Sequence, residues 1–482
     1  MAALHALTFL GAAPLDDEYI LYRYAHNLLA GEGLVFNAGE RVEGYTQPLW
    51  LLLLSAARAL GLAPVAATRL LGIASAALAV YATAEAWRLR FPRARVPAPA
   101  LLLAALPAFA FHAVAGLGTP LLAALLACWA WAWARDEERG APGLLPAALL
   151  GLAGLARPEA VVFLVPYLAV EAQRGRLARA LPALVPLAGW TAFRVAYYGR
   201  LLPITYHVKK LPPLVDLGYG LDYLVRATLE CGVLVAALLA LFALARNPVS
   251  LGRALGTAAL GAVLHVGYVL WVGGDYMPFA RFSLPALPLL LIAACAGLRG
   301  RFLRRPAALR AFLIAALLLP QWTQLGPRSE VFALHEANEE RWIAVGQTLA
   351  ERVAPGTSVA VSAVGAIGFH SELPIVDLLG MTNHAIAEAA PDLVIEIKGH
   401  HRHDADWVLA QRPDLIVLGS GGRLLPGTQT LALFRWEEGV LAHPEFERSY
   451  RTMAMPVAGS YPLYFFLRDG APRPAGAVPV GG

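Results

Sequence analysis

Long apolar runs separated by short polar loops dominate this 482-residue chain. A helix needs about 20 apolar residues to cross a bilayer, and runs near that length predict membrane-spanning helices. The expected spans are 66–87, 97–114, 119–134, 143–156, 160–171, 180–197, 231–245, 254–272, 282–298 and 307–320. Residues 1–15 lack the features of a signal peptide and are expected to be the end of one more helix, which makes about eleven in all. The apolar segment 48–62 is short and contains Arg58, which predicts an interfacial helix.

Arginine-rich loops alternate with loops that lack such an excess. The basic loops are 88–95, 135–139, 172–179, 246–253 and 299–305. Because positively charged loops stay in the cytoplasm, the other loops are predicted to face outward. The outward set comprises 16–48, 116–120, 157–159, 197–210, 273–281 and the chain after residue 321. The polar motifs of the chain are therefore expected on one side of the membrane.

The pattern changes after residue 321. Apolar runs shorten to strand length at 358–368, 373–380, 414–419 and 461–469, with helical patterns at about 330–353 and 402–411. The predicted fold is a mostly α-helical polytopic membrane domain at 1–320, whose first outer loop is 16–65, followed by a soluble α/β domain at 321–470. The Pro- and Gly-rich tail at 471–482 is expected to be disordered.

Composition excludes several classes of protein. The chain is 58% hydrophobic and 15% charged, whereas soluble domains carry about 25% charged residues. Its net charge of +5 is carried mainly by loop arginines, which suits a membrane face and not a nucleic-acid surface. The cysteines, Cys128, Cys231 and Cys295, all lie in apolar runs, which predicts no disulfide framework. No Gly-rich phosphate loop supports a nucleotide-sugar donor.

Three consecutive acids, Asp16, Asp17 and Glu18, interrupt the apolar chain. Adjacent carboxylates repel each other, so they persist where a cation, a proton or a sugar hydroxyl lies between them. At the membrane edge, such a pair can act as a base or hold a divalent metal, Mg²⁺ or Mn²⁺. The structural alternative is an acidic helix N-terminus, because the residues that follow have helical spacing.

This stretch resembles the bacterial GT-C membrane glycosyltransferases, whose motif reads YxxxRYAxNLxxGxGLVFNxGExVEGYTxPLW after an acidic pair. It is most similar to the arabinofuranosyltransferase-like group, which uses polyprenyl-phosphate sugar donors. The resemblance implies transfer of a sugar, arabinofuranose in that group, to a glycan, lipid or protein acceptor. It also implies a bacterial inner membrane, with the active site and C-terminal domain facing the periplasm. We assign Asp17 as the catalytic carboxylate, Asp16 as its support or as a metal ligand, and Tyr45 to substrate binding.

Three more outer loops resemble family motifs. Residues 197–210 match YYGxLLPNTxYxK, with Ile204 in place of Asn, residues 273–282 match GGDxMxxxRF, and residues 157–159 match RPE. Cations in these loops are expected to bind the donor phosphate and their neighbours the substrate. The phosphate-binding set is Lys209, Lys210, Arg281 and His207, and the substrate-binding set adds Asp275, Arg157, Glu159 and Tyr206. The structural alternatives are headgroup anchoring by the lysines, an Arg–Glu pair, and a salt-bridged turn.

Two other segments do not match what a binding or metal site would require. Residues 116–120 resemble a family segment SGLET, but Gly118 stands where the acid is expected. The histidines His400, His401 and His403 are expected at the surface, because adjacent residues at a helix start point in different directions and no ligand partners have the right spacing.

Two other functions compete with sugar transfer. The alternative is a membrane transporter or flippase of a lipid-linked or small polar substrate, and a third is an inactive glycan-binding relative. Transporters place ionisable groups at the bilayer midplane and often have repeated halves. Here the polar motifs lie at one interface and no internal repeat is visible, which favours the glycosyltransferase.

Overall fold

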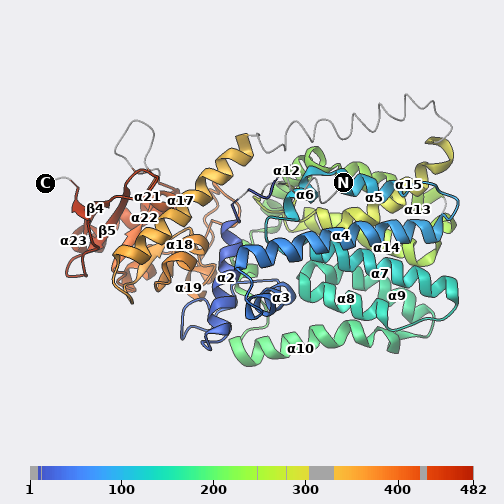
Figure 1. Ribbon diagram of the computed structural model, residues 1–482, viewed down its shortest axis with the longest axis horizontal. Helices are drawn as coiled ribbons and strands as arrows, with labels where there is room; N and C mark the ends of the chain where they lie inside the picture. Colours follow the sequence, from blue (N-terminus) through green and yellow to red (C-terminus); the bar gives the residue numbers. More distant parts are fainter. Residues whose placement is uncertain are drawn as a thin grey trace. The chain divides into compact units, whose positions relative to one another are not determined.

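The structure is a computed structural model that describes residues 9–11, 13–246, 248–277, 279–302, 330–423, 431 and 433–480. The chain divides into two compact units (Figure 1), which we call the helical unit and the α/β unit. The helical unit is Met1–Ala12, Gln47–Val195 and Pro212–Ala333, and the α/β unit is Ala13–Thr46, Ala196–Leu211 and Leu334–Gly482. The α/β unit thus joins the C-terminal segment to two segments that the sequence assigns to residues 1–320.

The helical unit is built from apolar helices that follow the apolar runs of the sequence. They are α3 (Pro48–Ala59), α4 (Pro64–Arg90), α5 (Ala98–Ala105), α6 (Pro107–His112), α7 (Thr119–Arg139), α8 (Leu145–Ala156), η2 (Pro158–Ala160), α9 (Val161–Gln173), η3 (Leu177–Ala180), α10 (Leu181–Tyr198), α12 (Pro213–Cys231), α13 (Val233–Arg246), α14 (Pro248–Trp271), η4 (Leu284–Ala286) and α15 (Leu287–Phe302). Small residues let these helices approach closely. A Cβ at Gly297 of α15, for example, would lie 2.8 Å from Ala243 Cβ of α13.

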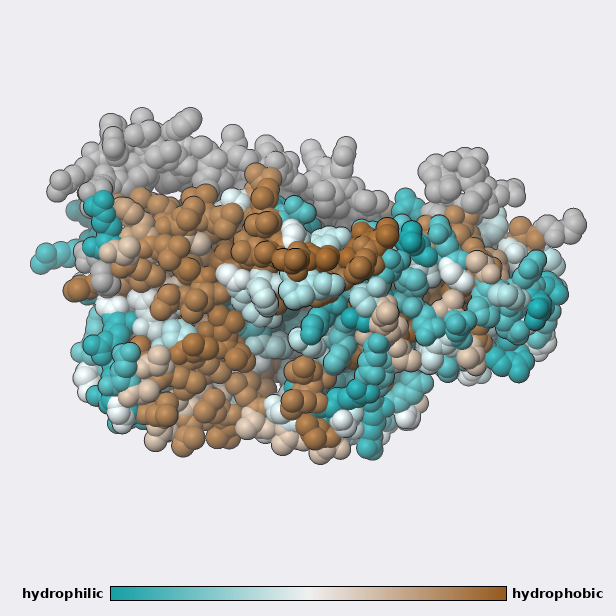
Figure 2. Space-filling view, turned by 180° about the vertical axis from the view of Figure 1, so that it is seen from behind, coloured by the Kyte–Doolittle hydropathy of each residue, from teal (hydrophilic) through white to brown (hydrophobic). Residues whose placement is uncertain are grey.

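Among the described helices, α4 and the Val249–Trp271 part of α14 are each long and apolar enough to cross a bilayer. The pair α12 and α13 meets the same criterion together, but it is bent by 89°. The predicted span 97–114 is instead two shorter helices, α5 and α6, because Pro107 cannot continue the first. Figure 2 shows apolar side chains over much of the visible face of this unit. The predicted span 307–320 lies outside the described residues, so the count of about eleven stays a prediction.

The predicted cytoplasmic loops contact one another within the helical unit. The contacts are Arg90 to Val249 O (2.7 Å), the Arg299 guanidinium to the Phe91 ring (4.7 Å), and Glu137 to both Arg174 and the Ala254 amide (2.8 Å). Because Val249 and Ala254 both belong to the start of α14, these contacts link all five arginine-rich loops at one end of the unit.

The α/β unit contains a six-stranded sheet in the order β2-β1-β3-β5-β4-β6. The strands are β1 (Val359–Val361), β2 (Ile375–Asp377), β3 (Leu415–Val417), β4 (Tyr450–Met455), β5 (Leu463–Arg468) and β6 (Val478–Pro479). β1 pairs in parallel with β2 and β3, and the remaining neighbours are antiparallel. β1, β2, β3 and β5 lie within the four predicted strand segments.

Helices flank this sheet and bury an apolar core against it. They are α2 (Asp16–Leu29), α11 (Ile204–Lys209), α17 (Glu330–Arg352), α18 (Val364–Ser371), α19 (His384–Glu388), α20 (Ala405–Ala410), α21 (Gly419–Gly422), α22 (Arg435–Leu441) and α23 (Pro444–Ser449). One core cluster includes Ala360, Ile416 and Phe466 from the sheet and Val408 and Val440 from the helices. The predicted helices at 330–353 and 402–411 correspond to α17 and α20.

Three features differ from the expectation. The second half of the predicted strand 358–368 is α18, a helix that packs against α2, where a Cβ at Gly368 would lie 3.0 Å from Arg23 Nη1. β4 was not expected, because its sequence lacks a clear apolar alternation, yet it pairs along its whole length with β5. The tail that was expected to be disordered contributes β6 to the sheet, where Val478 pairs with Ala454.

Arg23 of α2 ties the first polar segment to the rest of the α/β unit. Its guanidinium is 7% exposed and lies 4.5 Å from the centre of the Phe36 ring. It donates hydrogen bonds to Phe36 O (2.7 Å), Gly368 O, Leu373 O (2.7 Å) and Asn37 Oδ1 (3.2 Å). Burial lowers the pKa of Arg23 to about 10, so the group is charged at neutral pH and depends on these acceptors.

We expect Arg23→Ala to lower the free energy of unfolding by about 3 kcal/mol, because buried carbonyl oxygens lose their donors. Arg23→Lys should restore only part of this loss, since one ammonium cannot reach acceptors on several segments. The measurement is the thermal unfolding midpoint of the purified protein, with Arg448→Ala, at an exposed position, as the control. Equal midpoints for Arg23→Ala and Arg448→Ala would contradict this role.

Candidate functional site

Asp16 begins α2 and is bound by its neighbours in the α/β unit. Its carboxylate accepts hydrogen bonds from the backbone amides of Gly365 (3.2 Å) and Ala366 (2.7 Å) at the start of α18. Its own amide donates to Glu339 Oε1 at 2.9 Å. A Cβ at Gly365 would clash with the Asp16 backbone, so glycine is required for this approach. Asp16 therefore acts as a structural tie between α2 and α18.

Burial governs the protonation of this group of acids. It raises the pKa of Asp16 to about 7, opposed by the Ala366 hydrogen bond and reinforced by the charge of Asp17. Burial also raises the pKa of Glu339 well above its usual range, and the charge of Asp16 adds to that effect. The raised pKa favours the neutral form of Glu339, and that form relieves the repulsion expected of clustered carboxylates. Sequence reasoning missed Glu339, because it lies in α17, more than 300 residues from Asp16.

Asp17 is half-buried, and its charge acts together with that of Lys209 on His400. Burial lowers the pKa of His400 to about 4, opposed by the charge of Asp17 and reinforced by that of Lys209. The Lys209 side chain passes close to Gly399, where a Cβ would lie 3.7 Å from Lys209 Cγ. A carboxylate, a cation and a neutral imidazole from three distant segments thus lie within electrostatic range of one another.

The histidine segment differs in part from the surface location expected of it. His401 is 2% exposed and accepts a hydrogen bond at Nδ1 from the Gly399 amide (3.2 Å). Lys398, which the sequence did not single out, is also buried. The surface prediction is therefore wrong for His401, because a turn at Gly399, with φ of +90°, folds the segment inward.

The other predicted phosphate-binding residues of this unit lie on or after α11. Tyr206 and Lys210 are exposed, with Lys210 Nζ 5.7 Å from the Tyr206 ring centre. His207 is half-buried next to Tyr206. Buried Ile204 and Val208 anchor α11 in an apolar cluster. This anchoring leaves the cationic end of α11 free of the core.

Tyr45 is part of a buried network and not of an open surface. Its hydroxyl lies 2.9 Å from that of Tyr198, which in turn donates to Leu34 O at 2.8 Å. Tyr45 is 3% exposed, and burial raises its pKa well above the usual range. The hydroxyl thus helps to hold the first loop against Tyr198 within the α/β unit.

The helical unit brings the remaining predicted site residues together. Arg157 and Glu159 form a buried ion pair, and Arg281 binds Asp275 Oδ2 through two nitrogens (2.7 and 2.6 Å). The Arg157 and Arg281 guanidinium groups lie 5.0 and 5.4 Å from the centre of the Phe282 ring.

His265, missed by sequence reasoning, is fully buried beside these pairs. It contacts Phe282 O through Nε2 at 2.8 Å. Its position on an apolar helix gave no motif that would have identified it. The two ion pairs that the sequence offered as structural alternatives therefore exist, within one buried polar cluster that also contains this histidine.

Gly118, which replaces the acid of the family segment, lies against Gln47 and Trp50 of the helical unit. Its amide donates to Gln47 Oε1 at 2.7 Å, and Trp50 Nε1 donates to Gly116 O at 2.8 Å. A Cβ at position 118 would lie 2.7 Å from Gln47 Oε1 and 3.1 Å from Trp50 Cβ. Any side chain at this position would displace these neighbours.

The described residues give little support to a bound metal. Both carboxylate oxygens of Asp16 already accept backbone amides. Within the described part of the chain, no group of three or more histidine, cysteine or acidic side chains is arranged to hold an ion. Among the described residues, the acidic pair therefore lacks the third such side chain that would complete a cluster of metal ligands.

Comparison with known proteins gives sequence relatives and a family match. Residues 331–466 match a family described as a domain of unknown function, DUF8728. The chain is 30% identical over 325 residues to a terminal β-(1→2)-arabinofuranosyltransferase of Corynebacterium glutamicum, covering 57% of this chain and 47% of that protein. It is 32% identical over 213 residues to the Mycobacterium tuberculosis protein of the same name, covering 39% and 34%. The chain thus matches less than half the length of these curated relatives.

Solved structures share its fold. ArnT from Cupriavidus metallidurans, bound to undecaprenyl phosphate, matches with a TM-score of 0.54 and 14% identity, over 78% of this chain and 84% of that one. An Archaeoglobus fulgidus oligosaccharyltransferase matches with a TM-score of 0.52 and 11% identity, over 99% and 75%. The predicted resemblance is confirmed: the chain has the fold of ArnT and of the archaeal oligosaccharyltransferase, and it is similar in sequence to terminal β-(1→2)-arabinofuranosyltransferases.

Proposed function

We propose that this chain is an integral-membrane glycosyltransferase that moves a sugar, arabinofuranose, from a polyprenyl-phosphate donor to an extracytoplasmic glycan, lipid or protein acceptor. The sugar is supported by the names of the two sequence relatives. The lipid donor is supported by the undecaprenyl phosphate bound to ArnT and the dolichol phosphate bound to the archaeal oligosaccharyltransferase.

One arrangement within the chain carries the proposal: Lys209 packs against Gly399, next to the half-buried His400, and the charges of Asp17 and Lys209 both act on that histidine. A carboxylate and a cation in one neighbourhood match the two needs of transfer from a phosphate, which are a base for the acceptor and a counter-charge for the leaving group. The paired Asp16 is held by amides of α18. It therefore fixes the backbone from which Asp17 projects.

The proposed mechanism uses these residues in turn. Lys209 and the neighbouring Lys210 hold the phosphate and stabilise the negative charge that grows as the sugar–phosphate bond breaks. The anomeric carbon gains oxocarbenium character, as in other glycosyl transfers. Asp17 takes the proton of the acceptor hydroxyl as that oxygen bonds to the anomeric carbon. His400, neutral at pH 7 because its pKa is about 4, adds no competing positive charge.

We place the active face outside the cytoplasm, in a bacterial inner membrane. This placement rests on the arginine-rich loops, which contact one another at one end of the helical unit. In the same unit, the 157–159 and 275–282 motifs cluster around Phe282. The positive-inside rule assigns the first end to the cytoplasm.

Asp17→Asn keeps the size and hydrogen-bonding reach of the side chain but removes the base. We expect a fall in kcat of about 10²–10⁴-fold with an unchanged unfolding midpoint. The assay is transfer from a polyprenyl-phosphate arabinofuranose donor by purified protein, with Glu32→Gln, an exposed acid of the same segment, as the control. Near wild-type turnover of Asp17→Asn would end the proposal. Inactivation of the wild-type protein by a chelator, reversed by Mg²⁺ or Mn²⁺, would mean that the acidic pair holds a metal and that Asp17 is not a simple base.

Lys209→Ala and Lys210→Ala should each lower kcat/KM for the donor by about 10–100-fold, because a charge-assisted phosphate contact is lost. Lys209→Arg should retain most of the activity. Arg281→Ala serves as the contrast: it leaves the buried Asp275 without its cation and should lower the unfolding midpoint. If Arg281→Ala alone reduced donor use at normal stability, the phosphate would belong to Arg281 and not to the lysines.

The C-terminus should lie outside the cytoplasm. A phosphatase reporter that folds only in the periplasm, fused after residue 482, should be active, and a fluorescent reporter that folds only in the cytoplasm should be dark. The same pair of reporters inserted after Arg93, in an arginine-rich loop, should give the reverse result. Matching signals at both positions would refute the proposed orientation.

A further inference from the structure

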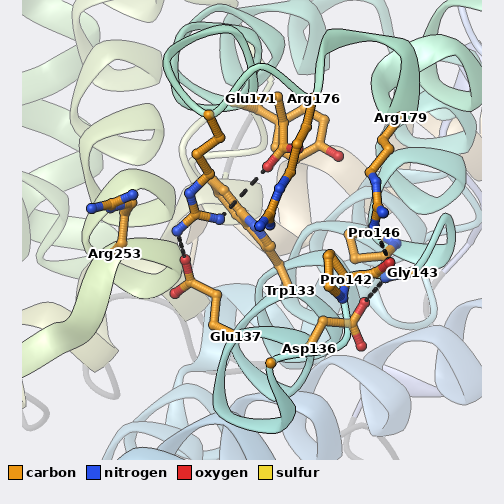
Figure 3. A pocket seen from close by; sticks show the side chains of 13 residues that line it. Trp133, Asp136, Glu137, Pro142, Gly143, Pro146, Glu171, Arg176, Arg179 and Arg253 are labelled. Carbon is orange, nitrogen blue, oxygen red and sulfur yellow. Dashed lines mark hydrogen bonds and ion pairs between the residues drawn. The ribbon is translucent and has the colours of Figure 1, made fainter.

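A cavity of about 400 Å³ lies in the helical unit, at the end where the arginine-rich loops meet. It is bounded by the end of α7, the chain that leads into α8, the end of α9 with the loop that follows, and Arg253 of α14 (Figure 3). The buried aromatic rings of Trp133 and Tyr167 form part of its wall. None of these residues takes part in the proposed sugar transfer.

This cavity is far from the loop of the same unit that contains Gly118. It lies at the C-terminal end of α7, whereas the loop that contains Gly118 precedes the N-terminal end. A helix of 21 residues is about 30 Å long. The cavity is therefore separated from that loop by about the thickness of a bilayer core.

The three acids of the cavity are used in holding its walls together. Asp136 Oδ2 accepts the Gly143 amide at 2.9 Å. Glu137 accepts from Arg174 and, at 2.8 Å, from the Ala254 amide. Arg174 also lies 3.8 Å from Glu171. Arg174 thus pairs with two of the acids, and the third, Asp136, has Arg135 Nη2 at 3.6 Å from its Oδ1.

Two other arginines of the cavity keep their charge available. Arg176 and Arg253 are exposed, and their guanidinium groups have no hydrogen-bond or ion-pair partner among the residues that the structure describes. They come from the loop after α9 and from α14, so the two cations enter the cavity from different elements (Figure 3). Arg179, which donates to Pro142 O, is a third cation of the lining.

Three exposed leucines are sequence neighbours of the lining residues, and we call them the apolar rim. Leu144 and Leu145 lie between the lining residues Gly143 and Pro146, and Leu177 follows Arg176. These three leucines are 57%, 49% and 54% exposed. Guanidinium groups next to exposed leucines fit a ligand with an anionic head and an apolar tail.

We propose that this cavity binds a phosphate ester through Arg176 and Arg253. The apolar rim favours the headgroup of an anionic phospholipid, and a free phosphate compound is the other source of the same chemistry. Guanidinium groups suit this ligand because they offer paired N–H donors to phosphate oxygens. The cavity then anchors the predicted cytoplasmic end of the helical unit to anionic lipid, independently of sugar transfer.

The test compares the full-length protein with Arg176→Gln/Arg253→Gln and with Arg93→Gln/Arg95→Gln. The control removes two exposed arginines from another arginine-rich loop, so it loses the same charge outside the cavity. Delipidated protein is mixed with equal amounts of phosphatidylglycerol and phosphatidylcholine, and bound lipid is counted by native mass spectrometry. In a second arm, the unfolding midpoint is measured in sodium phosphate and in sodium chloride of equal ionic strength.

Wild type and control should bind more phosphatidylglycerol than phosphatidylcholine. In the cavity variant, the ratio of bound phosphatidylglycerol to bound phosphatidylcholine should fall at least tenfold. A midpoint raised by phosphate in wild type and control only, without lipid preference, would support the site with a free phosphate as its ligand. If the cavity variant matched the control in both arms, the proposal would be overturned. The single variants Arg176→Gln and Arg253→Gln replace the double variant if its midpoint in chloride shows a loss of fold.

Discussion

The buried guanidinium of Arg23 is the interaction on which the α/β unit depends. A charge with 7% exposure is tolerated only when its donors are satisfied, and its acceptors come from the loop after α2 and from both sides of the α18 C-terminus. The first polar segment is therefore part of the core of a unit whose sheet begins more than 300 residues later. The position of Asp17, six residues before Arg23 on α2, follows from the packing of that core.

In this arrangement, the adjacent carboxylates of Asp16 and Asp17 have different neighbours. Asp16 meets the first amides of α18, whose hydrogen bonds oppose the rise of its pKa, and it is fixed by them. Asp17 instead acts on His400, together with Lys209. The two side chains meet different neighbours because successive residues of a helix point about 100° apart. The sequence predicted Asp16 as a support or metal ligand beside Asp17, and it held no sign of the α18 amides that bind Asp16.

Short-range sequence patterns predicted those strands and helices that depend mainly on their own residues. The buried strands β1, β2 and β3 are short β-branched runs, and α17 and α20 have helical periodicity. The segment of α18 was predicted as the end of a strand. Its small residues Gly365 and Gly368 are needed because α2 packs closely against them, and the sequence alone does not show that contact. His401 and Glu339 carry no sequence signal, since their burial depends on segments distant in the chain. The buried Arg–Glu and Asp–Arg pairs correspond to the structural alternatives that the sequence left open beside binding roles, and those were visible because the acids and bases are near neighbours in sequence.

Gly118 stands where the resembling family segment has an acid, and the side chains of Gln47 and Trp50 fill the space around it. The Gly118 amide is bound by the Gln47 side chain, and the space that a Cβ would need is taken by Gln47 and Trp50. An acid at 118 and these two side chains in their present positions exclude each other. The missing carboxylate is thus replaced by a neutral contact that fixes the loop through its backbone. Restoring the acid at 118 without changing position 47 would disturb the loop and would not recreate the family arrangement.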